Sequence, residues 1–348
     1  MGQGYFAGID LHKTVIQLCV LDARGEVVEE QRIVGRGPED GAKVLAVLRS
    51  FRDGLRVVIE SVGMNRWLVD QLRSEEIEVA VADPARLGLR QSGKKTDRRD
   101  AHELARRLYL GDIDRAAKSY YANDEEYGQR KVLRVRHQLV QIRQQLVNQI
   151  RGVLNAYRIV APATSLWRPR ALAWLRQESF ADTGLRAGMV ALVDTLEQTQ
   201  VSIRALDVEI KRLAKESRTA QLLVEIVPSV GEQTALTPCS ELGDVKRFHS
   251  SKAVVSQAGL APRVANSADR QHHGRITKRG SPELRWILTQ TAVRLLHKDA
   301  VARRWAAPML RRMHANKVRI ALARRLLVGL YHMLTTGEVF SLERCLTH

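Results

Sequence analysis

The chain has 348 residues, 45% of them hydrophobic, and its 56 Lys and Arg outnumber its 38 Asp and Glu, which gives a net charge of +18. This length allows two or three structural units with buried cores. The charge far exceeds what solubility requires, so it favours a polyanionic partner and counts against a metabolic kinase.

The positive charge is concentrated in two regions of the sequence. Residues 84–158 carry 17 basic against 8 acidic side chains, and residues 260–325 carry 16 against 3. We expect both regions to contribute nucleic-acid-binding surfaces.

The cysteines and the first apolar run indicate in which cellular compartment the protein is expected. The three cysteines lie far apart and match neither a zinc-site nor a C-x-x-C spacing, which fits a reducing cytoplasm. Asp10, His12 and Lys13 interrupt the first apolar run, and no stretch of 18 apolar residues occurs. The sequence therefore predicts a cytoplasmic protein without a membrane partner.

The first 82 residues combine a three-stranded antiparallel meander with α/β alternation. The predicted strands are Tyr5–Asp10, Val15–Leu21, Glu26–Val34, Arg56–Glu60 and Glu78–Ala82, and the predicted helices are Pro38–Phe51 and Asn65–Arg73. This layout predicts an α/β domain with an RNase H-like fold, which we place at residues 1–122.

Two long helical patterns follow. Apolar residues recur at spacings of 3 and 4 within Tyr127–Tyr157 and, more regularly, within Met189–Leu213. We interpret them as an antiparallel coiled-coil hairpin at residues 123–220, with a Pro- and Trp-containing break between the helices. The regular Met189–Leu213 seam also predicts contacts between protomers. Two ordinary amphipathic helices on a globular core are the alternative. We expect residues 221–348 to form a third, mainly α-helical unit.

Four carboxylates stand where a metal site would need them. Asp10 and Glu60 end predicted strands, and Asp97 and Asp100 open a predicted helix, where an i, i+3 spacing places them on one face. Phosphodiester chemistry uses hard oxygen ligands for Mg²⁺ or Mn²⁺, so the four acids together predict a catalytic metal centre. The alternative for Asp97 and Asp100 is an acidic first helical turn capped by Thr96.

Five short motifs in order resemble the DEDD transposases of the IS-110/IS-1111 insertion-sequence family, known as bridge-RNA-guided recombinases. They are Gly8-Ile9-Asp10-Leu11-His12-Lys13, Ile59-Glu60-Ser61-Val62-Gly63, Lys95-Thr96-Asp97-Arg98-Arg99-Asp100-Ala101, Val227-Pro228-Ser229-Val230-Gly231 and Gln257-Ala258-Gly259-Leu260-Ala261-Pro262. The resemblance implies a RuvC-like domain, a coiled-coil insertion and a C-terminal transposase domain. It also implies target and donor DNA, a structured guide RNA, and a homo-oligomer, dimer or tetramer.

The same resemblance implies a serine nucleophile a few residues after Pro262. By position this is Ser267, in a predicted polar loop. Ser281 is a competitor, but its neighbours Pro282 and Glu283 indicate a helix N-cap instead. The predicted nucleic-acid-binding residues flank the carboxylates and this serine: Lys94, Lys95, Arg98, Arg99, Arg263, Arg270, Arg275, Lys278, Arg279 and Arg285.

Other functions fit parts of the pattern. In a RuvC-like metal-dependent junction nuclease, water would be the nucleophile and Ser267 would be incidental. An RNase H-fold sugar or acetate kinase lacks its Gly-Thr phosphate turn, because Asp10-Leu11-His12-Lys13 stands there. A non-catalytic RNA-binding scaffold would explain the basic charge but not the four carboxylates. We therefore expect a transposase that cuts and rejoins DNA.

Overall fold

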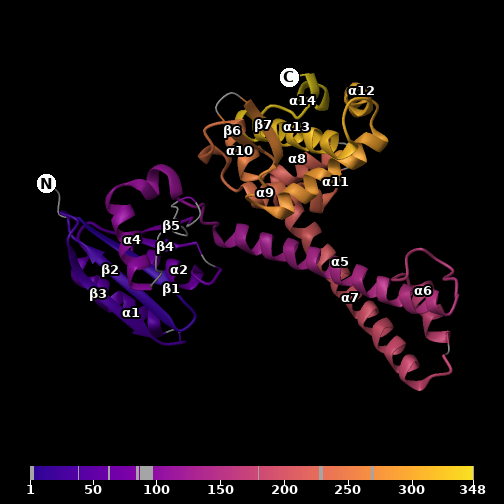
Figure 1. The fold of residues 1–348 in the computed structure, drawn as a ribbon, viewed down its shortest axis with the longest axis horizontal. Coiled ribbons are helices and arrows are strands. Elements are labelled where there is room, and N and C mark those ends of the chain that lie inside the picture. The colour runs from indigo at the N-terminus through magenta and orange to yellow at the C-terminus, as the bar shows by residue number, and fades with distance from the viewer. Residues whose placement is uncertain are drawn as a thin grey trace. The chain divides into compact units, whose positions relative to one another are not determined.

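The computed structural model describes residues 4–347 except 38, 62, 84–85, 87–96, 179, 227–229 and 268–269. It divides into two compact units, one ending at Tyr121 and the other beginning at Ala122 (Figure 1). The predicted division of the second part into residues 123–220 and 221–348 stays a prediction.

A five-stranded sheet organises the described part of the first unit. Its strands are β1 Tyr5–Leu11, β2 Val15–Leu21, β3 Val27–Val34, β4 Leu55–Glu60 and β5 Glu78–Ala82, in the order β3-β2-β1-β4-β5. The first three strands form the expected antiparallel meander, and β4 and β5 continue the sheet in parallel with β1. The strand bounds agree with those predicted to within a residue or two.

Helices cover both faces of this sheet. On one face, α1 Glu39–Leu48 and α2 Arg66–Ser74 pack on alternate residues of β1, Ala7, Ile9 and Leu11. On the other face lies α4 Asp97–Tyr109, with Leu104 and Leu108 against β4 and β5. A 3-10 turn, Arg49–Phe51, extends α1, and a π-helical turn, Ile113–Ala117, follows α4. The period of two in β1 and β4 thus assigns each strand residue to one helical layer.

Gly8 lets α4 lie directly on strand β1. A Cβ atom at Gly8 would be 2.2 Å from the Ala101 carbonyl oxygen and 2.4 Å from the Ala105 amide nitrogen. Ala101 and Ala105 are themselves fully buried. Only a strand residue without a side chain and helix residues with very small ones permit this backbone approach.

Two long helices open the second unit. They are α5 Asp124–Ala156 and α7 Thr183–Glu216, and they pack along each other (Figure 1). Two cross-helix bonds fix an antiparallel register, because Arg136 Nε donates to Asp207 Oδ1 at 2.9 Å and Arg143 Nη1 donates to Gln200 Oε1 at 2.9 Å. The predicted break between the helices contains a further helix, α6 Pro169–Gln177, because Pro169 occupies its first turn rather than interrupting it.

The hairpin helices have apolar packing at both ends and polar contacts between them. At one end Val147, Ile150 and Val193 form a core with α6. At the other end Leu133 and Ile210 join the core of the C-terminal helices. The intervening stretch holds the two guanidinium contacts on either side of the buried Ile203, so polar contacts and apolar packing alternate along the hairpin.

The rest of the second unit is mainly helical, as predicted. Its elements are α8 Arg218–Ile226, α9 Glu232–Leu242, the 3-10 turn Val245–Arg247, α10 Ser251–Gln257, β6 Pro262–Ser267, β7 Arg270–Ile276, α11 Pro282–Lys298, α12 Ala300–Leu310, α13 Ala315–Thr336 and α14 Leu342–Thr347. The hairpin of β6 and β7 was not predicted. None of the helices in the described ranges is long and apolar enough to cross a membrane.

We expect Gly8→Ala to lower the free energy of unfolding by about 1–3 kcal/mol, because the new methyl group must push α4 off the sheet. Thermal unfolding of the purified chain measures this. Gly4→Ala is the matched control, because a Cβ there meets nothing closer than 3.7 Å. Equal stability of the Gly8→Ala variant and the wild type would contradict the packing argument.

Candidate active site

Two carboxylates end adjacent parallel strands on the α4 face of the sheet. Ile9 of β1 is paired with Ile59 of β4, so the next residues, Asp10 and Glu60, come side by side at the ends of the strands. Ile9 and Ile59 face α1 and α2, and the alternation therefore turns Asp10 and Glu60 to the opposite face. Glu60 is the last residue of β4, as predicted, and Asp10 is the penultimate residue of β1, which extends one residue beyond the predicted end.

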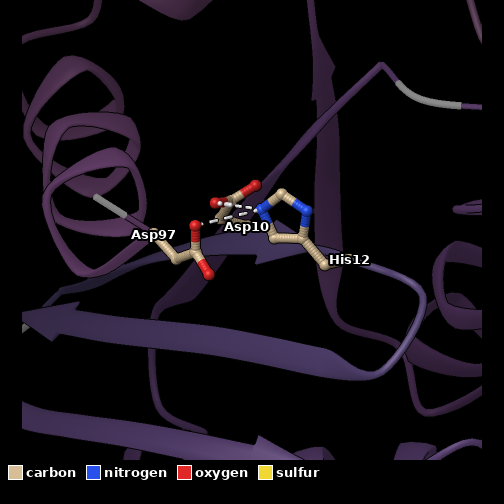
Figure 2. A group of neighbouring side chains, drawn as sticks. All are labelled: Asp10, His12 and Asp97. Carbon is tan, nitrogen blue, oxygen red and sulfur yellow. Dashed lines mark hydrogen bonds and ion pairs between the residues drawn. The ribbon is translucent and has the colours of Figure 1, made fainter. Parts of the chain in front are cut away.

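The first turn of α4 brings two more acids to the same place. Asp97 and Asp100 both lie in this turn. Figure 2 shows Asp97 at the start of the helix, converging with Asp10 and His12 at the end of the strand. His12 Nε2 lies 3.1 Å from Asp10 Oδ2 and 3.3 Å from Asp97 Oδ1. The predicted cap Thr96 lies outside the described residues.

Asp10 is the buried member of this group. Its side chain is 6% exposed, whereas those of His12 and Asp97 are 47% and 50% exposed. Burial raises the pKa of the Asp10 carboxyl above its ordinary value, His12 opposes this rise, and the negative charges of Asp100 and Asp97 add to it. An ionised Asp10 is therefore costly to the folded chain unless a cation is close by.

The donor set suits a hard divalent cation. One ligand atom each from Asp10, His12 and Asp97 lies within 4.8 Å of the other two. Asp100 acts electrostatically on the same buried carboxylate, and Glu60 neighbours it through the strand register. Carboxylate oxygens in this number provide both the ligands and the countercharge that Mg²⁺ or Mn²⁺ needs.

His12 is a site residue that the sequence reasoning missed. The sequence places His12 in the first family motif and in the interruption of the first apolar run, and neither feature assigns it to the metal site. The signal that could have found it is its spacing, because residues two apart on a strand share a face, and His12 follows Asp10 by two.

Ser267 lies in the second unit, at the end of a strand. It is the last residue of β6, where it pairs with Arg270 of β7, rather than being in a loop as predicted. The side chains of residues 264–273 lie outside the description. The backbone nonetheless places Ser267 at the end of β6, opposite the first residue of β7.

Two glycines hold the base of this β-hairpin. Gly259 has φ +66°, and a Cβ there would be 2.3 Å from the Arg279 carbonyl oxygen. Gly280 has φ +107°, and a Cβ there would be 1.8 Å from the Gln257 carbonyl oxygen. The Gln257–Pro262 motif therefore packs backbone to backbone against the start of α11. Ser281 caps that helix, accepting from the Leu284 amide at 3.0 Å, as predicted.

The predicted nucleic-acid-binding residues differ in their surroundings. Arg263, Arg275, Lys278 and Arg279 are exposed, as such a role requires. Arg285 is not, because it is half-buried and donates to the Ala258 carbonyl oxygen at 3.0 Å. This contact gives Arg285 a structural role in the Gly259 turn.

The two arginines that follow Asp97 in the sequence also differ in their surroundings. Arg98 pairs with Glu30 of β3, so it could reach a phosphate only by leaving that partner. Arg99 is exposed. Lys94 and Lys95 lie outside the described residues, as does the side chain of Arg270.

A carboxylate cluster on this kind of sheet, in a strongly basic chain, defines the class of metal-dependent enzymes that act on nucleic-acid phosphodiesters. Comparisons with known proteins agree. A family model of IS110-type DEDD proteins described as "Transposase" matches residues 7–159, and one described as "Transposase IS116/IS110/IS902 family" matches residues 221–306.

Relatives match over most of the chain. The transposase for insertion sequence element IS1111A of Coxiella burnetii is 26% identical over 96% of this chain and 90% of its own length. A "Probable family 20 transposase" of Pseudomonas aeruginosa is 26% identical over 91% of this chain and 93% of its own. The transposase for insertion sequence element IS1328 of Yersinia enterocolitica is 34% identical over 40% of this chain and 42% of its own length. The chain belongs to the IS110/IS1111 family of DNA transposases.

We expect Asp10→Asn to stabilise the metal-free chain by about 0.5–2 kcal/mol near pH 7. The pKa of Asp10 is raised on folding, so its ionisation lowers stability as pH rises above the unfolded value, and the amide removes that cost. The gain should disappear as pH falls toward about 4. Thermal unfolding in EDTA measures it.

Adding Mg²⁺ should raise the unfolding temperature of the wild type but not of the Asp10→Asn variant. Asp53→Asn, in an exposed turn, is the control and should behave like the wild type under both conditions. A less stable metal-free Asp10→Asn variant would show that the carboxylate has a favourable partner of its own.

Proposed function

We propose that this transposase exchanges DNA strands with Ser267 as nucleophile and with a divalent metal centre held by Asp10, Glu60, Asp97 and Asp100, under the guidance of a structured RNA. The proposal of a metal centre rests on one observation: His12 and Asp97 converge on the buried Asp10 carboxylate. The role of Ser267 rests on its position in the family motif order and on its place at the end of β6, in a pair of strands whose sequence contains three arginines.

The proposed chemistry conserves the energy of the cleaved phosphodiester in a covalent bond between Ser267 and the DNA. The Ser267 hydroxyl oxygen forms a bond to phosphorus, the bond from phosphorus to the deoxyribose oxygen breaks, and the proton of the serine passes to a base while the leaving oxygen gains one. A hydroxyl of another strand then reverses the step and frees the serine. A divalent metal would supply charge neutralisation at the phosphate. The carboxylates would position it.

The basic surface of the second unit supports the nucleic-acid partners. Arg263, Arg275, Lys278 and Arg279 are exposed around the hairpin and the turn that follows it. Guanidinium and ammonium groups at this density bind phosphates of either DNA or RNA. Guidance by RNA remains the part of the proposal that the family resemblance implies.

A protein–DNA adduct tests the nucleophile. We expect wild type and Ser281→Ala to form a denaturation-resistant adduct with a nicked suicide DNA that carries the insertion-sequence ends, and Ser267→Ala to form none. The adduct should also be lost in EDTA and in Asp10→Asn, because the hydroxyl is a weak nucleophile without the metal centre. Product without any adduct would instead favour water as nucleophile, as in a junction nuclease.

We also propose that the hairpin joins protomers, through a different face from the predicted seam. The structure buries Leu196 and Ile203 of that seam within the same chain, at 0% and 1% exposure. Val201 and Val208, one heptad apart on α7, are 50% and 69% exposed. Isolated apolar residues at this spacing on an exposed helix face fit a partner helix.

Charged substitutions separate the two faces of α7. We expect the double variant Val201→Lys and Val208→Lys to keep its helical circular dichroism and to lose mass in light scattering, because both valines are exposed in the single chain. Leu196→Lys should instead lower the unfolding temperature, because it places a charge in the core. An unchanged mass for the double valine variant would show that Val201 and Val208 face solvent and do not join protomers.

A further inference from the structure

A cavity of about 290 Å³ opens at the same edge of the sheet as the carboxylates but on the α1/α2 face, where its lining includes Leu11, Ile16 and Asp40. Three loops border it, each following the end of a strand or opening a helix. They contribute His12 and Lys13 after β1, Gly35, Arg36 and Gly37 after β3, and Met64 and Trp67 at the start of α2. His12 thus lines the cavity and also contacts Asp10 and Asp97.

The wall of this cavity is held in place by hydrogen bonds. The Gly35 amide donates to the Thr14 carbonyl oxygen at 3.2 Å, which ties the β3–α1 loop to the β1–β2 turn. The buried Asp40 accepts from the Gly37 amide at 3.2 Å and from Lys43 Nζ at 2.9 Å. The cavity is therefore preformed rather than created by a movable side chain.

The lining combines an apolar surface with free positive charge. Trp67 and Met64 are 40% and 38% exposed, although both are large and apolar, and neither belongs to the core of the sheet. Lys13 and Arg36 are exposed, and within the described ranges neither forms an ion pair. An exposed indole flanked by unpaired cations has the chemistry of a surface that stacks a base and holds its phosphates.

The size and position of the cavity indicate that it binds a part of the DNA substrate. A volume of about 290 Å³ is at the lower limit of the roughly 300–1,000 Å³ of small-molecule pockets, and a nucleobase is a small planar ligand. Ligands of open α/β sheets bind outside the carboxyl ends of the strands, where both the cavity and the carboxylates lie. His12 lines the cavity and its Nε2 lies 3.1 Å from Asp10 Oδ2, so His12 connects the cavity to the carboxylates around the edge of the sheet.

We propose that this cavity receives one nucleobase extruded from the DNA strand beside the phosphate at the carboxylate cluster, with the base stacked on Trp67. The inference rests on the proposed function of that cluster. Extrusion would unstack the duplex at the cleavage site, and the stacking on Trp67 would offset the cost. Lys13 and Arg36 would hold the phosphates on either side of the extruded nucleotide.

Abasic DNA tests the proposal. The full-length chain, with the nucleic acid that co-purifies with it and Mg²⁺, cleaves a duplex spanning the insertion-sequence ends, in which single nucleotides near the cleaved phosphate are replaced in turn by an abasic analogue. Trp67→Ala should cleave intact DNA about 10-fold more slowly than the wild type, the loss expected when one base–aromatic stack is removed. One abasic position should make the two rates equal, because no base remains to be stacked.

Matched variants separate stacking from other effects. Trp67→Leu keeps an apolar side chain without the flat ring and should be as slow as Trp67→Ala, whereas Trp67→Phe should keep most of the rate. Val28→Ala, an exposed apolar residue of β3 outside the cavity, should cleave like the wild type. Circular dichroism checks that each variant is folded.

The outcomes distinguish this inference from the function on which it rests. Wild-type cleavage by Asp10→Asn would overturn the proposed metal centre. If Asp10→Asn is inactive but Trp67→Ala cleaves intact DNA at the wild-type rate, or is slow with every abasic position, the base-binding role of the cavity is wrong while the metal centre stands.

Discussion

The contact between α4 and strand β1 at Gly8 is the constraint on which the active site depends. Asp10 is fixed by the sheet and Asp97 and Asp100 by a helix, and these elements are far apart in sequence. The helix can bring its first turn to the strand end only because Gly8, Ala101 and Ala105 leave no side chains between the backbones. Close packing therefore sets the distance between the carboxylates.

The same packing makes the site costly in the absence of a cation. It buries Asp10 on the α4 face and places further negative charge next to it, which raises the pKa of the Asp10 carboxyl. A group that the fold itself destabilises is typical of a functional site rather than of a structural one. The partly exposed His12 and Asp97 keep one side of the cluster open to a substrate phosphate.

Much of the first unit could be predicted from the sequence, because its central strands are short apolar runs bounded by turn residues and its helices have regular apolar spacing. The β6–β7 hairpin could not. Its segments, such as Gln271-His272-His273-Gly274, have no apolar alternation, and their strand pairing comes from cross-strand hydrogen bonds. The residues that cover the seam of the long hairpin could not be predicted either. Apolar spacing shows that a helix face is buried, but it does not show whether the same chain or a second protomer buries it.

The two guanidinium contacts in the middle of the long hairpin have a mechanical consequence. A slip of α5 past α7 by one heptad would separate Arg136 from Asp207 and Arg143 from Gln200, and would leave the half-buried guanidinium groups without their acceptors. Sliding is therefore opposed, while the apolar ends resist splaying. Moving α5 relative to α7 in either way must therefore break contacts at several points along the helices, so the two helices are held together over most of their length.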